Sequence, residues 1–106
     1  MKEYSEVHAR RRAVTGCCPF CARSLDLTFH HLVPRKLHRR SRFRRQYTRE
    51  ALGIGVYVCR DCHDAIHGTY DEITLAREFS TPQKLADDTA LQRHFHWLSR
   101  QRRRRP

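Results

Sequence analysis

The chain has 106 residues, of which 39% are hydrophobic and 31% charged, and its formal net charge is +11 with histidine counted as neutral. A chain of this length forms one domain whose small hydrophobic core gives only limited stability. We therefore expect a bound metal to stabilise the fold. The charge predicts a polyanionic partner. Because 19 of the 22 basic residues are arginine, whose planar fork binds phosphate oxygens in pairs, nucleic acid is favoured over an acidic protein surface.

No apolar run approaches membrane-spanning length, and the amino terminus lacks the apolar core of a signal peptide. These features predict a cytoplasmic protein without a membrane partner. Thiols stay reduced in the cytosol, where closely spaced cysteine pairs bind metal more often than they form disulfides. We therefore interpret the cysteines as metal ligands, with disulfides as the alternative.

The chain begins with a basic lead-in, residues 1–15, in which three consecutive arginines start at Arg10. This segment predicts a short helix or a loose arm, either solvated or in contact with phosphate. The sequence Gly-Cys-Cys-Pro-Phe-Cys that follows is typical of a zinc knuckle, a tight turn whose thiolates accept hydrogen bonds from backbone amides. Cys18 and Cys21 have the two-residue spacing of a knuckle. Cys17 is left over, although it could replace Cys18 in a strained geometry.

Two short strands are predicted next. Residues 25–33 read as a strand whose apolar side faces the core, and it ends at Pro34, with His30 and His31 close to that end. Residues 53–58 predict a turn and a second strand. If the two strands pair antiparallel, they bring the two Cys-x-x-Cys elements together at one end of the sheet.

The most basic internal segment, residues 35–50, lies between the two strands and contains one acid, Glu50. So many like charges repel one another unless an anion lies across them. We predict nucleic-acid contacts for Arg35, Lys36, Arg39, Arg40, Arg42, Arg44, Arg45 and Arg49. Phe43 and Tyr47 are four residues apart, which indicates a helix with a thin apolar stripe. Packing of these rings on the core is favoured over stacking on a base.

Helices are predicted for the rest of the chain. The first is expected to begin with Asp61 as its cap and to end at Gly68. Residues 71–79 predict the second, a third begins at Pro82 with the preceding threonine as its cap, and a last one starts at about Asp88. The apolar stripe of that last helix consists of Leu91, Phe95 and Leu98. We predict one domain over residues 1–106: the lead-in, a core at about 16–70, a helical extension at 71–101 and an arginine-rich tail at 102–106.

Two metal-ligand spacings overlap in the run Cys-Arg-Asp-Cys-His-Asp-Ala-Ile-His. Cys59 and Cys62 form the second Cys-x-x-Cys pair, which supplies the other half of a tetrahedral zinc site. His63 and His67 are four residues apart, so on a helix both imidazoles lie on one face and can bind a single ion. One short element therefore serves two metals.

The histidine pair on the first strand and this double motif together resemble the HNH endonuclease family, in particular its members with a four-cysteine zinc knuckle. The resemblance covers about residues 18–67. It is carried by Leu-Thr-Phe-His-His-Leu-Val-Pro-Arg from Leu27 and by Val-Cys-Arg-Asp-Cys-His-Asp-Ala-Ile-His from Val58. It implies an α+β fold with a small ββα-metal (HNH/His-Me finger) core, a zinc knuckle of four cysteines and additional C-terminal helices. It also implies hydrolysis of DNA phosphodiester bonds.

By position, the resemblance makes His31 the general base and places His30, His63 and His67 around a divalent catalytic metal. The structural Zn²⁺ ligands are expected to be Cys18, Cys21, Cys59 and Cys62. Phosphodiester hydrolysis needs a base for the attacking water and a cation at the phosphate, and histidine is partly neutral at physiological pH. Three imidazoles favour Zn²⁺, Ni²⁺ or Mn²⁺, whereas Mg²⁺ prefers oxygen ligands. No small-molecule cofactor is expected.

The chain contains no asparagine, the residue that gives the family the middle letter of its name. In the family this residue steadies the loop between the strands, and its backbone helps to orient the base. We hypothesise that a backbone carbonyl within residues 52–54 holds His31 instead. The alternative function is a zinc-stabilised module that binds DNA or RNA without catalysis. The remaining histidines, which fit no constellation, are His8, His38, His94 and His96.

Overall fold

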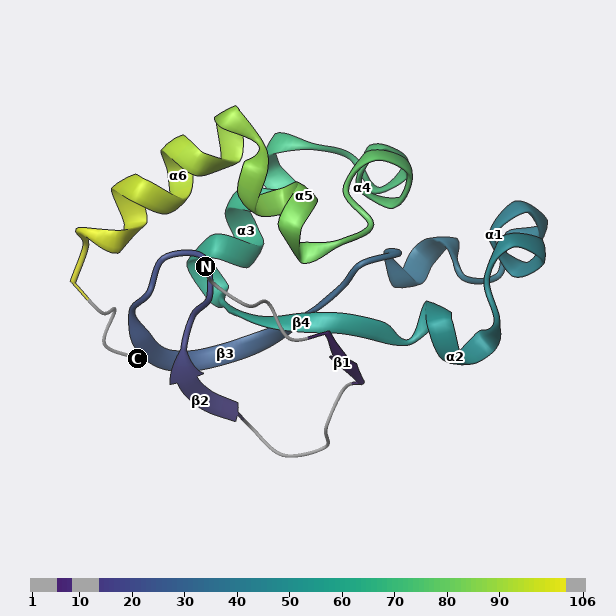
Figure 1. Ribbon diagram of the computed structural model, residues 1–106, viewed down its shortest axis with the longest axis horizontal. Helices are drawn as coiled ribbons and strands as arrows, with labels where there is room; N and C mark the ends of the chain where they lie inside the picture. The colour runs from purple at the N-terminus through teal and green to yellow at the C-terminus, as the bar shows by residue number, and fades with distance from the viewer. Residues whose placement is uncertain (1–5, 9–13, 103–106) are drawn as a thin grey trace.

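The computed structural model describes residues 6–8 and 14–102, and there it has the predicted α+β class, with one four-stranded antiparallel sheet and helices (Figure 1). The strands are β1 (Val7–His8), β2 (Val14–Cys17), β3 (Ser24–His31) and β4 (Ile54–Cys59). A 3-10 turn, η1 (Arg35–Leu37), precedes the helices α1 (Ser41–Gln46), α2 (Arg49–Leu52), α3 (Arg60–Thr69), α4 (Glu72–Glu78), α5 (Pro82–Asp87) and α6 (Thr89–Ser99).

The sheet has the strand order β1-β4-β3-β2. The predicted antiparallel pairing of β3 with β4 is confirmed, in a register that joins Leu27 to Cys59 and His31 to Gly55. Because β2 also pairs antiparallel with β3, the end of β2, the start of β3 and the end of β4 lie at one end of the sheet. This register places the first knuckle beside the start of α3.

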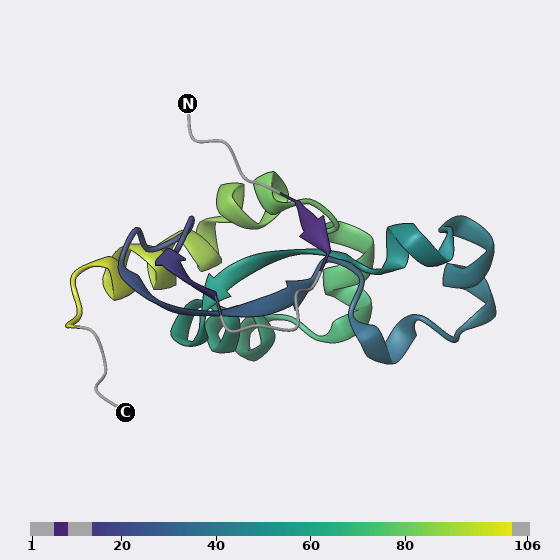
Figure 2. The same ribbon diagram turned by 90° about the horizontal axis from the view of Figure 1, so that it is seen from below.

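Helices α3 to α6 lie over one face of the sheet, while α1 and α2 project from the end where β3 finishes and β4 begins (Figures 1 and 2). The main core contains the four cysteines of the two Cys-x-x-Cys pairs. It also contains the fully buried side chains of Val58, Ile66, Leu75, Leu85 and Leu91. A smaller cluster under the basic segment contains Val33, Leu37, Phe43, Leu52 and Ala76. Phe43 is therefore a core residue, as the packing interpretation predicted, and Tyr47 packs against the same cluster.

The predicted starts of the last three helices are confirmed by their caps. The side chain of Asp71 accepts a hydrogen bond from the Thr74 amide, Thr81 accepts from Lys84 with Pro82 first in its helix, and Asp88 accepts from Leu91. These caps are local, so the sequence pattern alone was sufficient to place them.

Several boundaries differ from the predictions. Strand β3 ends at His31, and Leu32 and Val33 are buried in the turn that follows it. Helix α3 begins after Cys59, whose sulfur accepts the Cys62 amide, and it ends at Thr69, one residue beyond the predicted end at Gly68.

The lead-in contributes strands β1 and β2 where the structure describes it, not a helix. The predicted arginine run from Arg10 lies outside the described residues, as does the tail beyond Arg102. In residues 6–8 and 14–102, no helix is both long and apolar enough to span a membrane.

Candidate metal centres

Four cysteines form a buried sulfur cluster. Cys18 and Cys21 come from the knuckle after β2, Cys59 from the end of β4 and Cys62 from the first turn of α3. All four are at most 1% exposed, and their sulfur atoms all lie within 4.8 Å of one another. Cys17 is exposed, and its thiol donates to the carbonyl of Ala22 (3.4 Å), so it lies outside this cluster.

The sulfur atoms accept hydrogen bonds from backbone and side-chain N–H groups, which favours their thiolate form. The Cys59 amide donates to Cys18 Sγ (3.4 Å), and the Cys62 amide donates to Cys59 Sγ (3.3 Å). Hydrogen bonds with Cys59 and Cys62 lower the pKa of Cys18 to about 3, whereas hydrogen bonds with Cys18 and Cys59 strongly raise the pKa of Cys62. A tetrahedral Zn²⁺ would stabilise four thiolates held this close together, and this donor set fits it.

Arg23 is part of this cluster, although its sequence context gave no signal. Its Nε donates to Cys21 Sγ (3.2 Å), and its Nη2 contacts both Cys59 Sγ (3.4 Å) and a carboxylate oxygen of Asp61 (3.2 Å). Asp61 was predicted to cap α3 and instead pairs with this guanidinium. The pair joins the knuckle to the first turn of the helix that carries the candidate catalytic histidines.

Three imidazoles form a second cluster, two of them on α3 after Cys62. His30 comes from the end of β3, and His63 and His67 come from one face of α3. One ring nitrogen from each lies within 4.8 Å of the others, and the ring centroids are 4.9–5.3 Å apart. His30 is buried, His63 half-buried and His67 exposed, so the cluster is open to solvent on one side.

His30 supplies the test of whether this cluster fits a metal. Its side chain is 0% exposed, and among the described residues neither of its ring nitrogens has a hydrogen-bond partner. An unsatisfied buried polar group costs about 1–3 kcal/mol, which coordination of an ion would offset. Burial first, and then the charge of the neighbouring histidines, lower the pKa of His30 to about 3 and that of His63 to about 4. Both rings are thus neutral at physiological pH, the form that binds metal.

His31 follows His30 but does not join the cluster of three. Its ring packs edge-on against Phe29 (4.7 Å between centroids) and His38 (5.5 Å). It lines a cavity of about 200 Å³ together with His63, His67 and Glu72. Burial, then the charges of His38 and Arg35, lower the pKa of His31.

No spacing in the sequence marks His38 as a site residue, yet it lies beside His31. Its Nε2 donates to the carbonyl of Val33 (2.6 Å), which holds the ring beside His31. The carbonyl of Ile54, within the segment predicted to orient His31, accepts the N–H of Leu32 (3.2 Å). Orientation of His31 by residues 52–54 stays a prediction.

A second, basic cavity of about 1070 Å³ is also lined by His31. Five of the eight predicted nucleic-acid contacts line it: Arg35, Lys36, Arg39, Arg44 and Arg49. Arg40, Arg42 and Arg45 are exposed but are not among its lining residues. No acid is found among the described residues that line this cavity, so its charge suits a polyanion.

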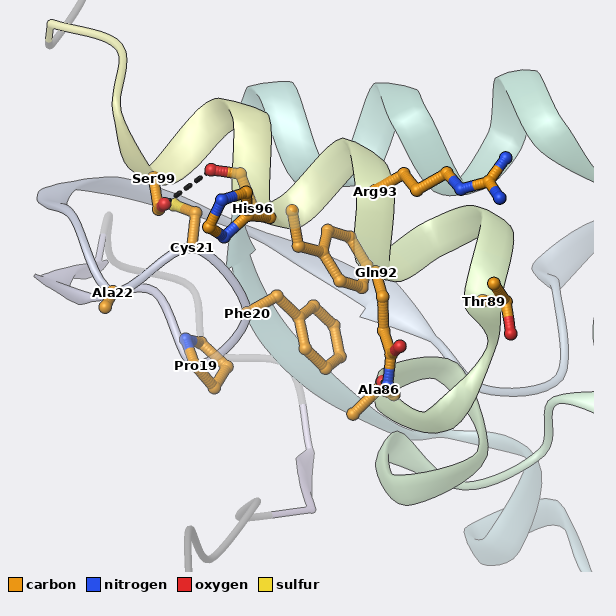
Figure 3. A pocket seen from close by; sticks show the side chains of 11 residues that line it. Pro19, Phe20, Cys21, Ala22, Ala86, Thr89, Gln92, Arg93, His96 and Ser99 are labelled. Atoms are coloured by element: carbon orange, nitrogen blue, oxygen red, sulfur yellow. Dashed lines mark hydrogen bonds between the residues drawn. The ribbon is translucent and has the colours of Figure 1, made fainter.

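A further cavity of about 710 Å³ lies between the knuckle and α6, with Phe20 and Gln92 facing each other across it (Figure 3). Phe20 stacks on Phe95 (4.6 Å between centroids), and Arg93 and His96 are also among the lining residues. Of the predicted site residues, Cys21 alone lines this cavity among the described residues.

Comparison of the chain with protein-family models, curated proteins and solved structures finds no match. The two clusters and the basic cavity are therefore the features from which a function can be inferred.

Proposed function

We propose that the chain is a metal-dependent endonuclease of the HNH type that hydrolyses phosphodiester bonds in DNA. The observation that carries the proposal is the position of His31, which lines both the basic cavity and the smaller cavity that His63 and His67 also line. A strand bound along the arginines would thus pass a candidate base that adjoins a candidate metal site. That juxtaposition is what hydrolysis of a phosphodiester requires.

The topology around the cluster also supports a ββα-metal core. Strands β3 and β4 are antiparallel neighbours and α3 follows β4 directly, so the histidines come from a strand end and a helix face. This is the arrangement that the resemblance to HNH endonucleases implies.

His30, His63 and His67 would hold the divalent ion, for which Zn²⁺, Ni²⁺ or Mn²⁺ suits imidazole better than Mg²⁺. When bound, the ion supplies positive charge to a phosphate oxygen as charge develops in the transition state. His31, neutral and half-buried, accepts the proton of the attacking water. The arginines of the basic cavity bind the flanking phosphates in pairs and fix the strand in position.

Nicking of supercoiled plasmid, measured across a series of divalent metals, tests the proposal. We expect the wild-type protein to nick in at least one metal, and His31→Ala to lower the rate by about 10²–10⁴ with plasmid binding retained. His94→Ala is the control, because His94 is exposed on α6 and is remote in sequence from both clusters. Binding without nicking in every metal would contradict the proposal and would favour the alternative, a non-catalytic zinc module.

A further inference from the structure

The hydroxyl of Thr28 bridges a strand and the metal-binding helix. Thr28 lies on β3 two residues before His30, and its Oγ1 is 3.1 Å from the carbonyl oxygen of Val58 on β4. The same Oγ1 is 2.9 Å from Nδ1 of His63 on α3. Thr28 is half-buried, as are both of these contacts.

The donors and acceptors in this bridge allow one arrangement in which both contacts are hydrogen bonds. A hydroxyl has a single proton to donate, and a carbonyl oxygen can only accept. The Thr28 proton therefore goes to Val58. His63 must then donate from Nδ1 to Oγ1, which makes its ring the tautomer with a proton on Nδ1 and a free lone pair on Nε2.

We propose that Thr28 is a positioning residue of the imidazole site, which holds His63 as the Nδ1–H tautomer so that Nε2 binds the metal. The inference rests on the proposed metal site of the endonuclease. Because Thr28 and Val58 are direct partners in the β3–β4 register, the hydroxyl also fixes the ring relative to the strand that delivers His30. Outer groups of this kind orient a ligating imidazole and raise its basicity.

The position of Thr28 gives the inference an independent basis. Residues two apart on a strand share a face, so Thr28 and His30 both point towards α3. His30, which is fully buried, is held by packing, since its ring nitrogens have no hydrogen-bond partner among the described residues. His63 is half-buried, and the Thr28 hydroxyl is the hydrogen-bond partner of its ring.

Calorimetric titration with Ni²⁺, on protein whose sulfur cluster is already loaded with Zn²⁺, tests the proposal. Thr28→Val keeps the branched shape without the hydroxyl, and we expect it to weaken Ni²⁺ binding about 10–100-fold. Thr28→Ser keeps the hydroxyl and should restore affinity close to the wild-type value. Equal affinity of wild type and Thr28→Val would overturn the inference but leave the proposed function standing. No second ion bound by the wild type would overturn both.

The tautomer itself can be measured on the wild-type protein, which covers the case in which Thr28→Val does not fold. Long-range ¹H–¹⁵N correlation spectra of the imidazoles distinguish the two neutral tautomers. We expect His63 to carry its proton on Nδ1 with and without Zn²⁺ at the imidazole site. A proton on Nε2 in the metal-free protein would overturn the proposal.

Discussion

Cys17 and Cys18 are neighbours in the sequence, yet the structure gives them opposite environments. Cys17 ends β2 with its side chain exposed, whereas Cys18 begins the knuckle with its sulfur fully buried. The turn is closed by hydrogen bonds from the Cys18 amide to the Arg23 carbonyl and from the Ala22 amide to the Cys18 carbonyl. The two-residue spacing therefore selects the cysteine that the structure places in the sulfur cluster.

Substitution of a cluster cysteine should unfold the domain. Cys62→Ser removes one of four sulfur ligands from the centre of a small core, and binding of structural zinc is worth about 10–16 kcal/mol in zinc-finger peptides. This exceeds or matches the whole stability of a typical domain, about 5–15 kcal/mol. We expect Cys62→Ser to lose the zinc that survives dialysis and to lose its helical circular dichroism. Cys17→Ser is the matched control and should retain about one zinc per chain; similar behaviour of the two variants would contradict the assignment.

The burial of His30 predicts that stability falls in mild acid. The pKa of His30 is about 3 in the folded chain and 6.5 in the unfolded chain. Below pH 6.5 the unfolded chain therefore gains a proton that the folded chain does not. Stability is then complete above pH 6.5 and decreases towards pH 3, by up to about 1.4 kcal/mol per pH unit for this proton. Urea unfolding between pH 7 and 5, without metal at the imidazole site and with sulfur-bound zinc verified, measures the slope. His30→Leu should give a shallower slope, and equal slopes would argue against this origin.

At the scale of elements, β3 and β4 approach closely where His30 turns into the core. A Cβ on Gly55 would collide with the carbonyl oxygen of His30 and lie 2.6 Å from Cζ of Phe29. On α3, by contrast, a Cβ on Gly68 would meet no atom within 4 Å. Gly55 lies on β4, beside the strand that carries His30, and Gly68 lies on α3, the helix that carries His63 and His67.

Alanine at these two glycines should change stability in opposite directions. We expect Gly55→Ala to destabilise by about 1–3 kcal/mol, the usual cost of overpacking, and to weaken metal binding because the backbone of His30 must move. Gly68→Ala should stabilise by about 0.5–1 kcal/mol, since glycine is unfavourable within a helix. Urea denaturation of the zinc-loaded proteins gives both values. Destabilisation by Gly68→Ala would show that this residue is needed at the end of α3.

The elements that the sequence predicted well are those whose signals are local. The caps at Asp71, Thr81 and Asp88 and the apolar stripe of α6 needed no information from other parts of the chain. Strand β1 could not be predicted, because its two residues are ordered by pairing with Ile54 and Gly55 far along the sequence.

The candidate site likewise contains residues that the sequence predicted and residues that it did not. The cysteine and histidine ligands have diagnostic spacings, and the structure brings each set of ligands together. The supporting residues are Arg23, His38 and Thr28. They contact residues 5 to 38 positions away in the sequence, so no short motif reveals them. Sequence thus identified the residues with metal-binding chemistry, and the structure was needed for the residues that support them.

At the scale of the whole molecule, five cations line one cavity in the part of the chain that the structure describes. The five cations of the basic cavity lie on η1, α1 and α2 or directly beside them, at the end of the sheet from which α1 and α2 project (Figure 2). The described acids lie mainly elsewhere, although Glu72 lines the imidazole cavity and pairs with Lys36 (3.6 Å). A polyanion should therefore bind from this end.

The salt dependence of binding tests where a strand lies. Each phosphate contact on duplex DNA contributes about 0.9 to the slope of log K against log salt, so Arg39→Ala with Arg44→Ala should lower the slope by about 1.8. Arg93→Ala with Arg100→Ala removes the same charge from α6 and its end, and should leave the slope near the wild-type value. Fluorescence anisotropy at several salt concentrations measures both. Equal effects of the two pairs would mean that binding follows net charge rather than the basic cavity.

The central claim is that one short chain holds two separate metal centres, one of sulfur and one of imidazole. Metal content per folded chain, measured by mass spectrometry after equilibration with Zn²⁺ and removal of free metal, tests it most directly. The account predicts two ions in the wild type and in His94→Ala, and one ion in His67→Ala with the fold unchanged. A single ion in all three proteins would contradict it.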